Sequence, residues 1–330
     1  MWAKGLVLIA VAACGGSDDS RHIKDAPGGG SDLGPQVAPG IYLTNAVNSV
    51  LAFDLDADGD TPPFRTIAGG TTQLSLPIGV TVDHAGNIYV ANRTGSNLTV
   101  YGADASGDVA PIRTMTATGM GSPEGMIRGP DDDIIVTTCP SCGQSAGGDT
   151  GVWHFARGAS TSDFSLTGSA TGFGAPSSPA IDNATSTIVI GNSFGGAIET
   201  FTSGQQGNVA PTSSFVPAAG YNIQSIALSS QSILVTSSGI GVDFYPRDAA
   251  NGASPSGSIA AADIGLSYPG GIYFDDTSTP KRIYLADYSA NAVFVLDLAG
   301  TEPNFTIQAK RKISGPSTML NQPLDIAVVH

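Results

Sequence analysis

The side chains of this sequence that could do chemistry are carboxylates and amides placed at the ends of short apolar runs. Two carboxylates each stand at the start of such a run, and four further polar residues each follow one; the set is Glu124, Asp325, Asn45, Asn92, Asn192 and Asp287. Oxygen ligands of these kinds hold hard cations such as Ca²⁺, and a bound cation could polarise a substrate carbonyl. The alternative is that Asn and Asp after a strand hydrogen-bond their own turn. The sequence leaves both open.

An acidic run at residues 54–60 begins like a calcium-binding EF-hand loop. Its twelfth position is Arg65, where such a loop needs a bidentate Glu. Residues 104–111 and 206–211 form similar turns at corresponding places further along the chain. The pattern therefore predicts a structural turn, with a weak accessory calcium site as the alternative.

Cys139 and Cys142 lie three positions apart in a longer insert. Thioredoxin-type redox chemistry needs such a pair at a helix start within a βαβ unit, and the sequence predicts none. In an oxidising compartment the pair favours a small disulfide that closes a loop. A metal site needs more ligands, and the nearest candidate, His154, is predicted to be a packed interior residue.

The first fourteen residues have the pattern of an export signal. Lys4 precedes an apolar run over residues 5–13, which is too short to span a bilayer. The small residues before Cys14 resemble the bacterial lipobox, so we expect residues 1–13 to be a lipoprotein signal peptide and Cys14 to carry the lipid. A simple secretory signal is the alternative.

Residues 14–39 are rich in Gly, Ser, Asp and Pro and predict a disordered tether. Residue 15 is Gly rather than Asp, which by resemblance to the enterobacterial sorting rule implies the outer membrane. We therefore expect a cell-envelope lipoprotein that is a monomer and meets the membrane through its lipid.

Composition narrows the fold class and the partners. The chain has 330 residues with 43 Gly, 21 Pro and only 13% charged residues, which suits short strands joined by tight turns. The formal net charge of -14 argues against nucleic acid as a partner, because nucleic-acid binding requires a basic surface. We predict an all-β protein.

A repeat runs through residues 40–330. An Ile followed by two apolar residues recurs at intervals of 47, 46, 54, 45 and 50 residues, beginning at Ile41, Ile88, Ile134, Ile188, Ile233 and Ile283. Apolar strands precede and follow each of these anchors, so every repeat predicts four short strands. Six such repeats predict a six-bladed β-propeller.

The two ends of the repeat region complement each other. The first repeat lacks its innermost strand, whereas residues 323–330 are a surplus that matches residues 77–84 almost position for position. The C-terminal strand is thus predicted to complete the first blade and close the ring, which removes exposed sheet edges.

The segments from Pro77 to Asp83 and from Gly86 to Asn92 resemble NHL-type propeller repeats, and blade six has the similar run from Ile283 to Asp287. The resemblance spans residues 40–330. It implies the propeller fold and a tendency to bind partners, because such propellers include both interaction modules and enzymes.

Two functions follow as hypotheses. The leading one is a non-catalytic module that binds a protein, peptide or glycan on the face carrying the cysteine insert and the loops between blades. The alternative is a metal-dependent hydrolase, because residues 123–125 resemble the first motif of gluconolactonase-like propellers. In that hypothesis Glu124 and Asp325 stand at equivalent depth at the axial mouth and hold Ca²⁺ or another divalent metal.

Overall fold

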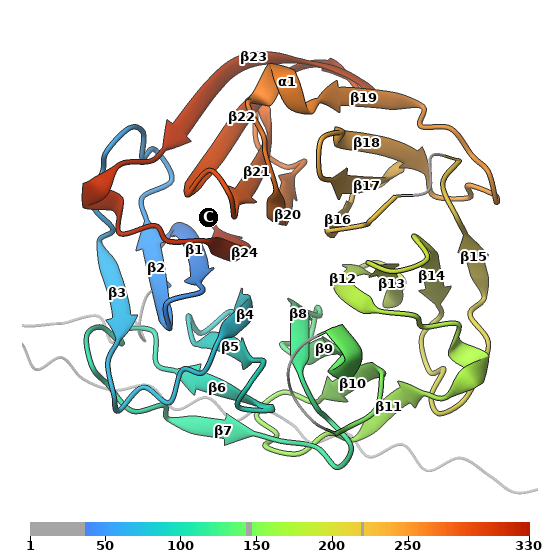
Figure 1. Ribbon diagram of the computed structural model, residues 1–330, viewed down its shortest axis with the longest axis horizontal. Helices are drawn as coiled ribbons and strands as arrows, with labels where there is room; N and C mark the ends of the chain where they lie inside the picture. The colour runs from blue at the N-terminus through green and yellow to red at the C-terminus, as the bar shows by residue number, and fades with distance from the viewer. Residues whose placement is uncertain (1–36, 143–146, 219–220) are drawn as a thin grey trace, which may run out of the picture. The chain divides into compact units, whose positions relative to one another are not determined.

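The computed structural model describes residues 37–142, 147–218 and 221–330. These residues form six antiparallel sheets of four strands each, arranged as a ring (Figure 1). This is a six-bladed β-propeller, so the predicted fold is confirmed. The predicted signal peptide, Cys14 and residues 15–36 of the tether lie outside the described residues and stay predictions. The described part of the chain contains no helix with the length and apolar character needed to cross a bilayer.

Each blade runs from an innermost strand at the axis to a fourth strand at the rim. In this order the first three blades are β24 (Pro323–Val329), β1 (Gly40–Asn45), β2 (Ser49–Phe53) and β3 (Arg65–Ala68); β4 (Pro77–Val82), β5 (Ile88–Asn92), β6 (Asn97–Tyr101) and β7 (Arg113–Met115); β8 (Pro123–Arg128), β9 (Ile134–Thr138), β10 (Gly151–Phe155) and β11 (Phe164–Thr167).

The other three blades follow the same order without exception. They are β12 (Pro176–Asp182), β13 (Thr187–Asn192), β14 (Ile198–Phe201) and β15 (Ser213–Phe215); β16 (Ser225–Leu228), β17 (Ser232–Ser237), β18 (Gly241–Pro246) and β19 (Gly257–Ala260); β20 (Pro269–Asp275), β21 (Lys281–Asp287), β22 (Ala292–Thr301) and β23 (Asn304–Ile313). In the described ranges four short helical turns connect strands: η1 (Pro140–Cys142), η2 (Ser169–Thr171), α1 (Ala261–Ile264) and η3 (Pro316–Thr318).

The hydrophobic core is a ring of interfaces between blades. Successive side chains of a strand point to opposite faces of its sheet, so Ile41 and Leu43 of β1 pack toward blade six whereas Tyr42 packs toward blade two. The described residues form six such clusters, one at each junction of neighbouring blades. Each blade therefore needs both of its neighbours to bury its apolar surface.

The C-terminal strand closes the ring at the axis, as predicted. β24 pairs with β1 so that Val328 lies opposite Ile41 and Ile326 lies opposite Leu43. Ile326 and Val328 also enter the cluster between blades six and one. The first blade is thus assembled from both ends of the repeat region.

A second closure lies at the rim, in the acidic run 54–60. Gly59, with a φ of 64°, donates its backbone N–H to the Lys312 carbonyl at 2.9 Å and accepts from Ser314 N–H at 3.0 Å. Asp60 accepts from the Ser317 backbone at 2.7 Å. Glycines at corresponding turns, Gly107 and Gly207, make the same two kinds of bond to the preceding blade. The predicted structural turn is therefore a clasp between blades, and it fastens blade one to blade six.

Two features differ from the sequence prediction. The predicted tether ends at residue 39, but Val37 already packs against the cluster between blades one and two, and the Tyr42 hydroxyl donates to the Ala38 carbonyl at 2.8 Å. In addition, β22 and β23 form a hairpin with ten residues in each strand. Phe305 of this hairpin packs in the cluster between blades five and six.

The axial closure predicts that a chain ending at Gln322 loses its cooperative thermal transition, because β1 then has an unpaired edge and one core cluster is opened. Adding a synthetic peptide of residues 323–330 should restore part of the transition, whereas a scrambled peptide should not. Calorimetry is the measurement. A truncated chain that melts like the full one contradicts the closure.

Candidate functional site

A cavity of about 770 Å³ lies on the propeller axis and is lined by residues from the innermost strands of all six blades. In five blades the pairing register shifts at the start of that strand. Such bulges re-aim side chains, and here the residues at the shift line the cavity. We call the side on which the innermost strands begin the mouth face.

Glu124 lines the cavity at this bulge in blade three. It is 3% exposed, and its Oε2 accepts a charged hydrogen bond from Arg93 of blade two. Its Oε1 accepts no hydrogen bond from the described residues. Burial raises the pKa of Glu124, and the Arg93 charge opposes that shift. The ion pair is a link between blades, and it leaves the second carboxylate oxygen buried without a hydrogen bond from the described residues.

Asp325 also lines the cavity, but it serves the ring closure. Its Oδ2 accepts the backbone N–H of Val80 in blade two at 3.0 Å, while Gly271 of blade six lies so close that a Cβ there would meet Oδ1 at 2.6 Å. Burial raises the pKa of Asp325 to about 7, against the hydrogen bonds from the Val80 and Ile326 backbones. The side chain thus bonds β24 to β4 and lies against Gly271 of β20.

The two carboxylates are not equivalent, in contrast to the prediction. Glu124 directly follows Pro123, whereas Asp325 is the second residue after Pro323, so the counterpart of Glu124 is Leu324. In the described part of the chain no three His, Cys, Asp or Glu side chains gather closely enough to hold a metal ion. Arg93 supplies the positive charge beside Glu124 that the hydrolase hypothesis assigns to a metal.

The recurring Asn and Asp residues are buried, and they hold loops of their own blades. Asn45, Asn92, Asn192 and Asp287 are each at most 1% exposed. Their side-chain oxygens accept backbone N–H groups of the loop that leads into the innermost strand, for example Ser75 N–H on Asn92 at 3.0 Å and Asn321 N–H on Asn45 at 3.2 Å. Their hydrogen-bonding capacity is used inside the protein, so we leave these four out of the candidate ligand contacts.

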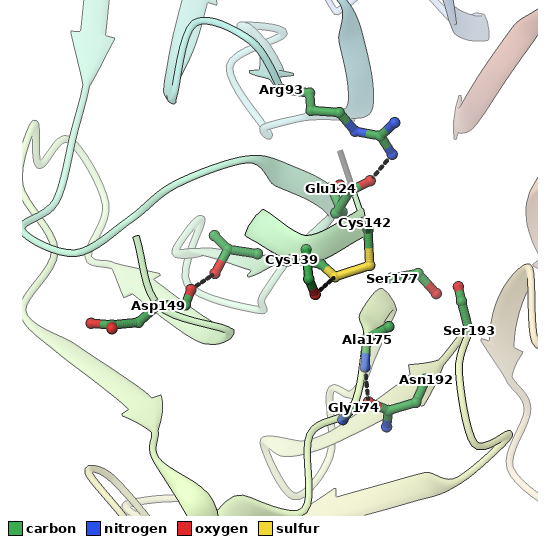
Figure 2. The surroundings of a disulfide bond; sticks show 12 residues. Arg93, Glu124, Cys139, Cys142, Asp149, Gly174, Ala175, Ser177, Asn192 and Ser193 are labelled. Atoms are coloured by element: carbon green, nitrogen blue, oxygen red, sulfur yellow. Dashed lines mark hydrogen bonds and ion pairs between the residues drawn. A yellow bond between two sulfur atoms is a disulfide. The ribbon is translucent and has the colours of Figure 1, made fainter. Parts of the chain in front are cut away.

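The cysteine insert reaches the mouth. Cys139 and Cys142 are joined by a disulfide, and Cys142 lines the cavity together with Glu124 and Arg93 (Figure 2). Ser177 and Ser193 line the same cavity and lie near the disulfide in Figure 2. The disulfide therefore borders the candidate site.

His154 is not available as a further ligand for the cysteines. Its Nδ1 pairs with Asp163 at 2.6 Å, its Nε2 pairs with Asp133 at 3.0 Å, and its ring stacks on Phe164. The two carboxylates raise the pKa of His154 although burial acts against them. The predicted core histidine is in fact half-buried and held by two ion pairs.

Sequence reasoning missed the exposed apolar side chains of the mouth face. Seven large apolar side chains are exposed in the described residues, and five lie on loops of this face: Val47, Phe194, Val216, Tyr268 and Met319. Phe194, at 62% exposure, and Tyr268, at 40%, also line the cavity. The only feature of the sequence that could have indicated Phe194 and Tyr268 is that each is an aromatic residue in a loop of mostly small and polar residues.

Comparisons with known proteins place this geometry in a fold but not in a family. No family model and no curated protein matches the sequence. The likeness is one of fold. A functionally unknown protein from Desulfotomaculum acetoxidans DSM 771 matches with a TM-score of 0.57 and 12% identity over 86% of this chain and 83% of its own. A chain of the nidogen/laminin complex matches with a TM-score of 0.56 and 14% identity over 88% of this chain and 97% of its own.

Asn192 has a buried acidic partner that makes stability depend on pH. Glu199 is 2% exposed and accepts a hydrogen bond from the Asn192 amide. Burial raises the pKa of Glu199 from 4.5 to about 8. The folded protein therefore keeps a proton that the unfolded chain releases above about pH 4.5, and the free energy of unfolding falls as pH rises toward 8.

Glu199→Gln should remove this dependence, because a neutral amide keeps the size of the side chain without the ionisation. We expect the melting temperature to rise by a few degrees at pH 8.5 and to change little at pH 4.5, measured by calorimetry. The control is Asp56→Asn, at an exposed carboxylate. Equal effects of Glu199→Gln at both pH values would contradict the assignment.

Proposed function

We propose that this protein is a membrane-tethered module outside the cytoplasm that binds a protein, peptide or glycan at the mouth of its axial cavity. The observation that carries the proposal is the gathering of exposed apolar side chains, Phe194 and Tyr268 above all, around that mouth. Exposed apolar groups beside a concave, partly polar cavity of several hundred Å³ are typical of binding sites. The likeness to solved structures is of fold only and leaves the ligand open.

The geometry supports binding better than metal-dependent hydrolysis. Glu124 is paired with a guanidinium, and Asp325 bonds to the backbones of the strands that close the ring. A cation beside Glu124 would meet the positive charge of Arg93, and Asp325 is already committed to its bond with the Val80 backbone. A site with exposed aromatic rings and neutral amides suits recognition of a ligand.

The mouth is tested with matched substitutions on opposite faces. Phe194→Asp should weaken capture of ligands from a cell-envelope fraction of the producing organism by about tenfold or more, because it removes apolar contact and adds a charge at the mouth. The control Ile112→Asp changes an equally exposed apolar residue on the other face. Captured protein, peptide and glycan are quantified separately, and equal capture by both variants would contradict the mouth as the site.

The tether is supported by the residues before Cys14 and is tested by Cys14→Ala. We expect the wild-type chain in the membrane fraction and the variant in the soluble envelope fraction, because a lipidated cysteine supplies the membrane affinity. Ser17→Ala is the control, and immunoblots of the two fractions are the measurement. Retention of the Cys14→Ala chain in membranes would overturn the lipid anchor.

A further inference from the structure

Blade five departs from the other blades at the mouth. Every other innermost strand begins at a Pro, whereas blade five has Ile223 at that position and β16 begins only at Ser225. A second, shallower depression lies over this blade, and we call it the blade-five notch. Its described lining is Tyr221, Asn222, Gln224, Ser237, Ser238, Ile240 and Tyr268. Asn222, Gln224 and Tyr268 line the axial cavity as well, so the two hollows form one continuous surface.

The lining of the notch carries no charged side chain in the part of the chain that the structure describes. Its polar groups are the amides of Asn222 and Gln224 and the hydroxyls of Ser237, Ser238, Tyr221 and Tyr268, all of which can both donate and accept hydrogen bonds. The Tyr221 hydroxyl already donates to Asp243. The two amides make no hydrogen bond to other described residues, and Asn222 is exposed while Gln224 is half-buried. The two amides are therefore free to pair with a ligand.

Tyr268 offers a flat ring that is held in place. Its backbone N–H donates to Asp287 at 3.1 Å, its carbonyl accepts from Tyr288 N–H at 2.9 Å, and its ring packs on the Tyr288 ring with centroids 5.8 Å apart. The ring is nonetheless 40% exposed. An exposed aromatic group that is already ordered loses little freedom on binding, which favours recognition.

We propose that a neutral oligosaccharide binds along the mouth and the blade-five notch, with a sugar ring on Tyr268 and its hydroxyls on the Asn222 and Gln224 amides. This inference rests on the proposed binding function and names its ligand class. A sugar chain presents hydroxyls, which match groups that both donate and accept, and an apolar ring face, which matches Tyr268. A charged ligand finds no counter-charge in the notch, and Ile240 is the one aliphatic side chain among its described lining residues, so a peptide with apolar anchors is matched less well.

The test uses the full chain in a detergent without a sugar headgroup and measures affinity by calorimetry. The probes are four- to six-unit neutral oligomers of glucose, N-acetylglucosamine, mannose and galactose, an oligomer of uronic acids, and an uncharged peptide of similar length. We expect at least one neutral oligomer to bind, and Tyr268→Ala and Gln224→Ala each to weaken it by about tenfold.

Two variants serve as controls. Tyr268→Phe keeps the ring and should retain the affinity, and Ile112→Ala on the opposite face should leave it unchanged. Melting temperatures close to that of the wild type show that each variant is folded.

Three outcomes would overturn the inference. The first is that a neutral oligomer binds but Tyr268→Ala does not weaken its binding. The second is that the peptide or the uronic-acid oligomer binds more tightly than every neutral oligomer. The third is that no neutral oligomer binds. Peptide binding that Phe194→Asp abolishes would leave the mouth as a binding site and remove only the sugar assignment. Envelope capture that does not distinguish Phe194→Asp from Ile112→Asp would remove the proposed function itself.

Discussion

The structure depends on the pairing of β24 with β1, because a ring of blades buries its apolar surface only if the last blade meets the first. Ile326 and Val328 join Ile41 and Leu43 in the core cluster between blades six and one. Without them, blades one and six would each expose one apolar face. The clasp at Gly59 acts at the rim of the same junction. The ring is therefore closed both at the axis and at the rim. Together these contacts fix the positions of all six innermost strands and hence the width of the axial cavity.

The fold was predictable because its determinants recur. Apolar residues at strand spacing and turn residues at a period of 45 to 54 residues mark every blade, and the match between residues 323–330 and 77–84 indicated the closure. The same recurrence misled the site prediction. A polar residue repeated at each strand end, such as Asn92 or Asp287, holds the incoming loop of its own blade, so repetition here marks structure.

The functional features lie where the repeat is interrupted. Arg93 and Glu124 come from different blades, and no local pattern predicts that they pair. Phe194 and Tyr268 stand in loops whose geometry depends on the closed ring. Blade five carried a visible signal, because it alone lacks the Pro that begins the other innermost strands. It also has Ser237 at the position where four of the other five blades have Asn or Asp. Departures from a repeat were therefore a better guide to the site than the repeat itself.

The central place of β1 in its sheet also has a mechanical consequence. β1 is hydrogen-bonded on one side to β24 and on the other to β2, and it is the first strand of the described residues. A pull along β1 from the segment before it loads both ladders in shear, so many hydrogen bonds share the force at once. A strand at the edge of the sheet would share it with one neighbour only. The blade assembled from both ends of the repeat region is thus suited to resist a pulling force applied through the segment before β1.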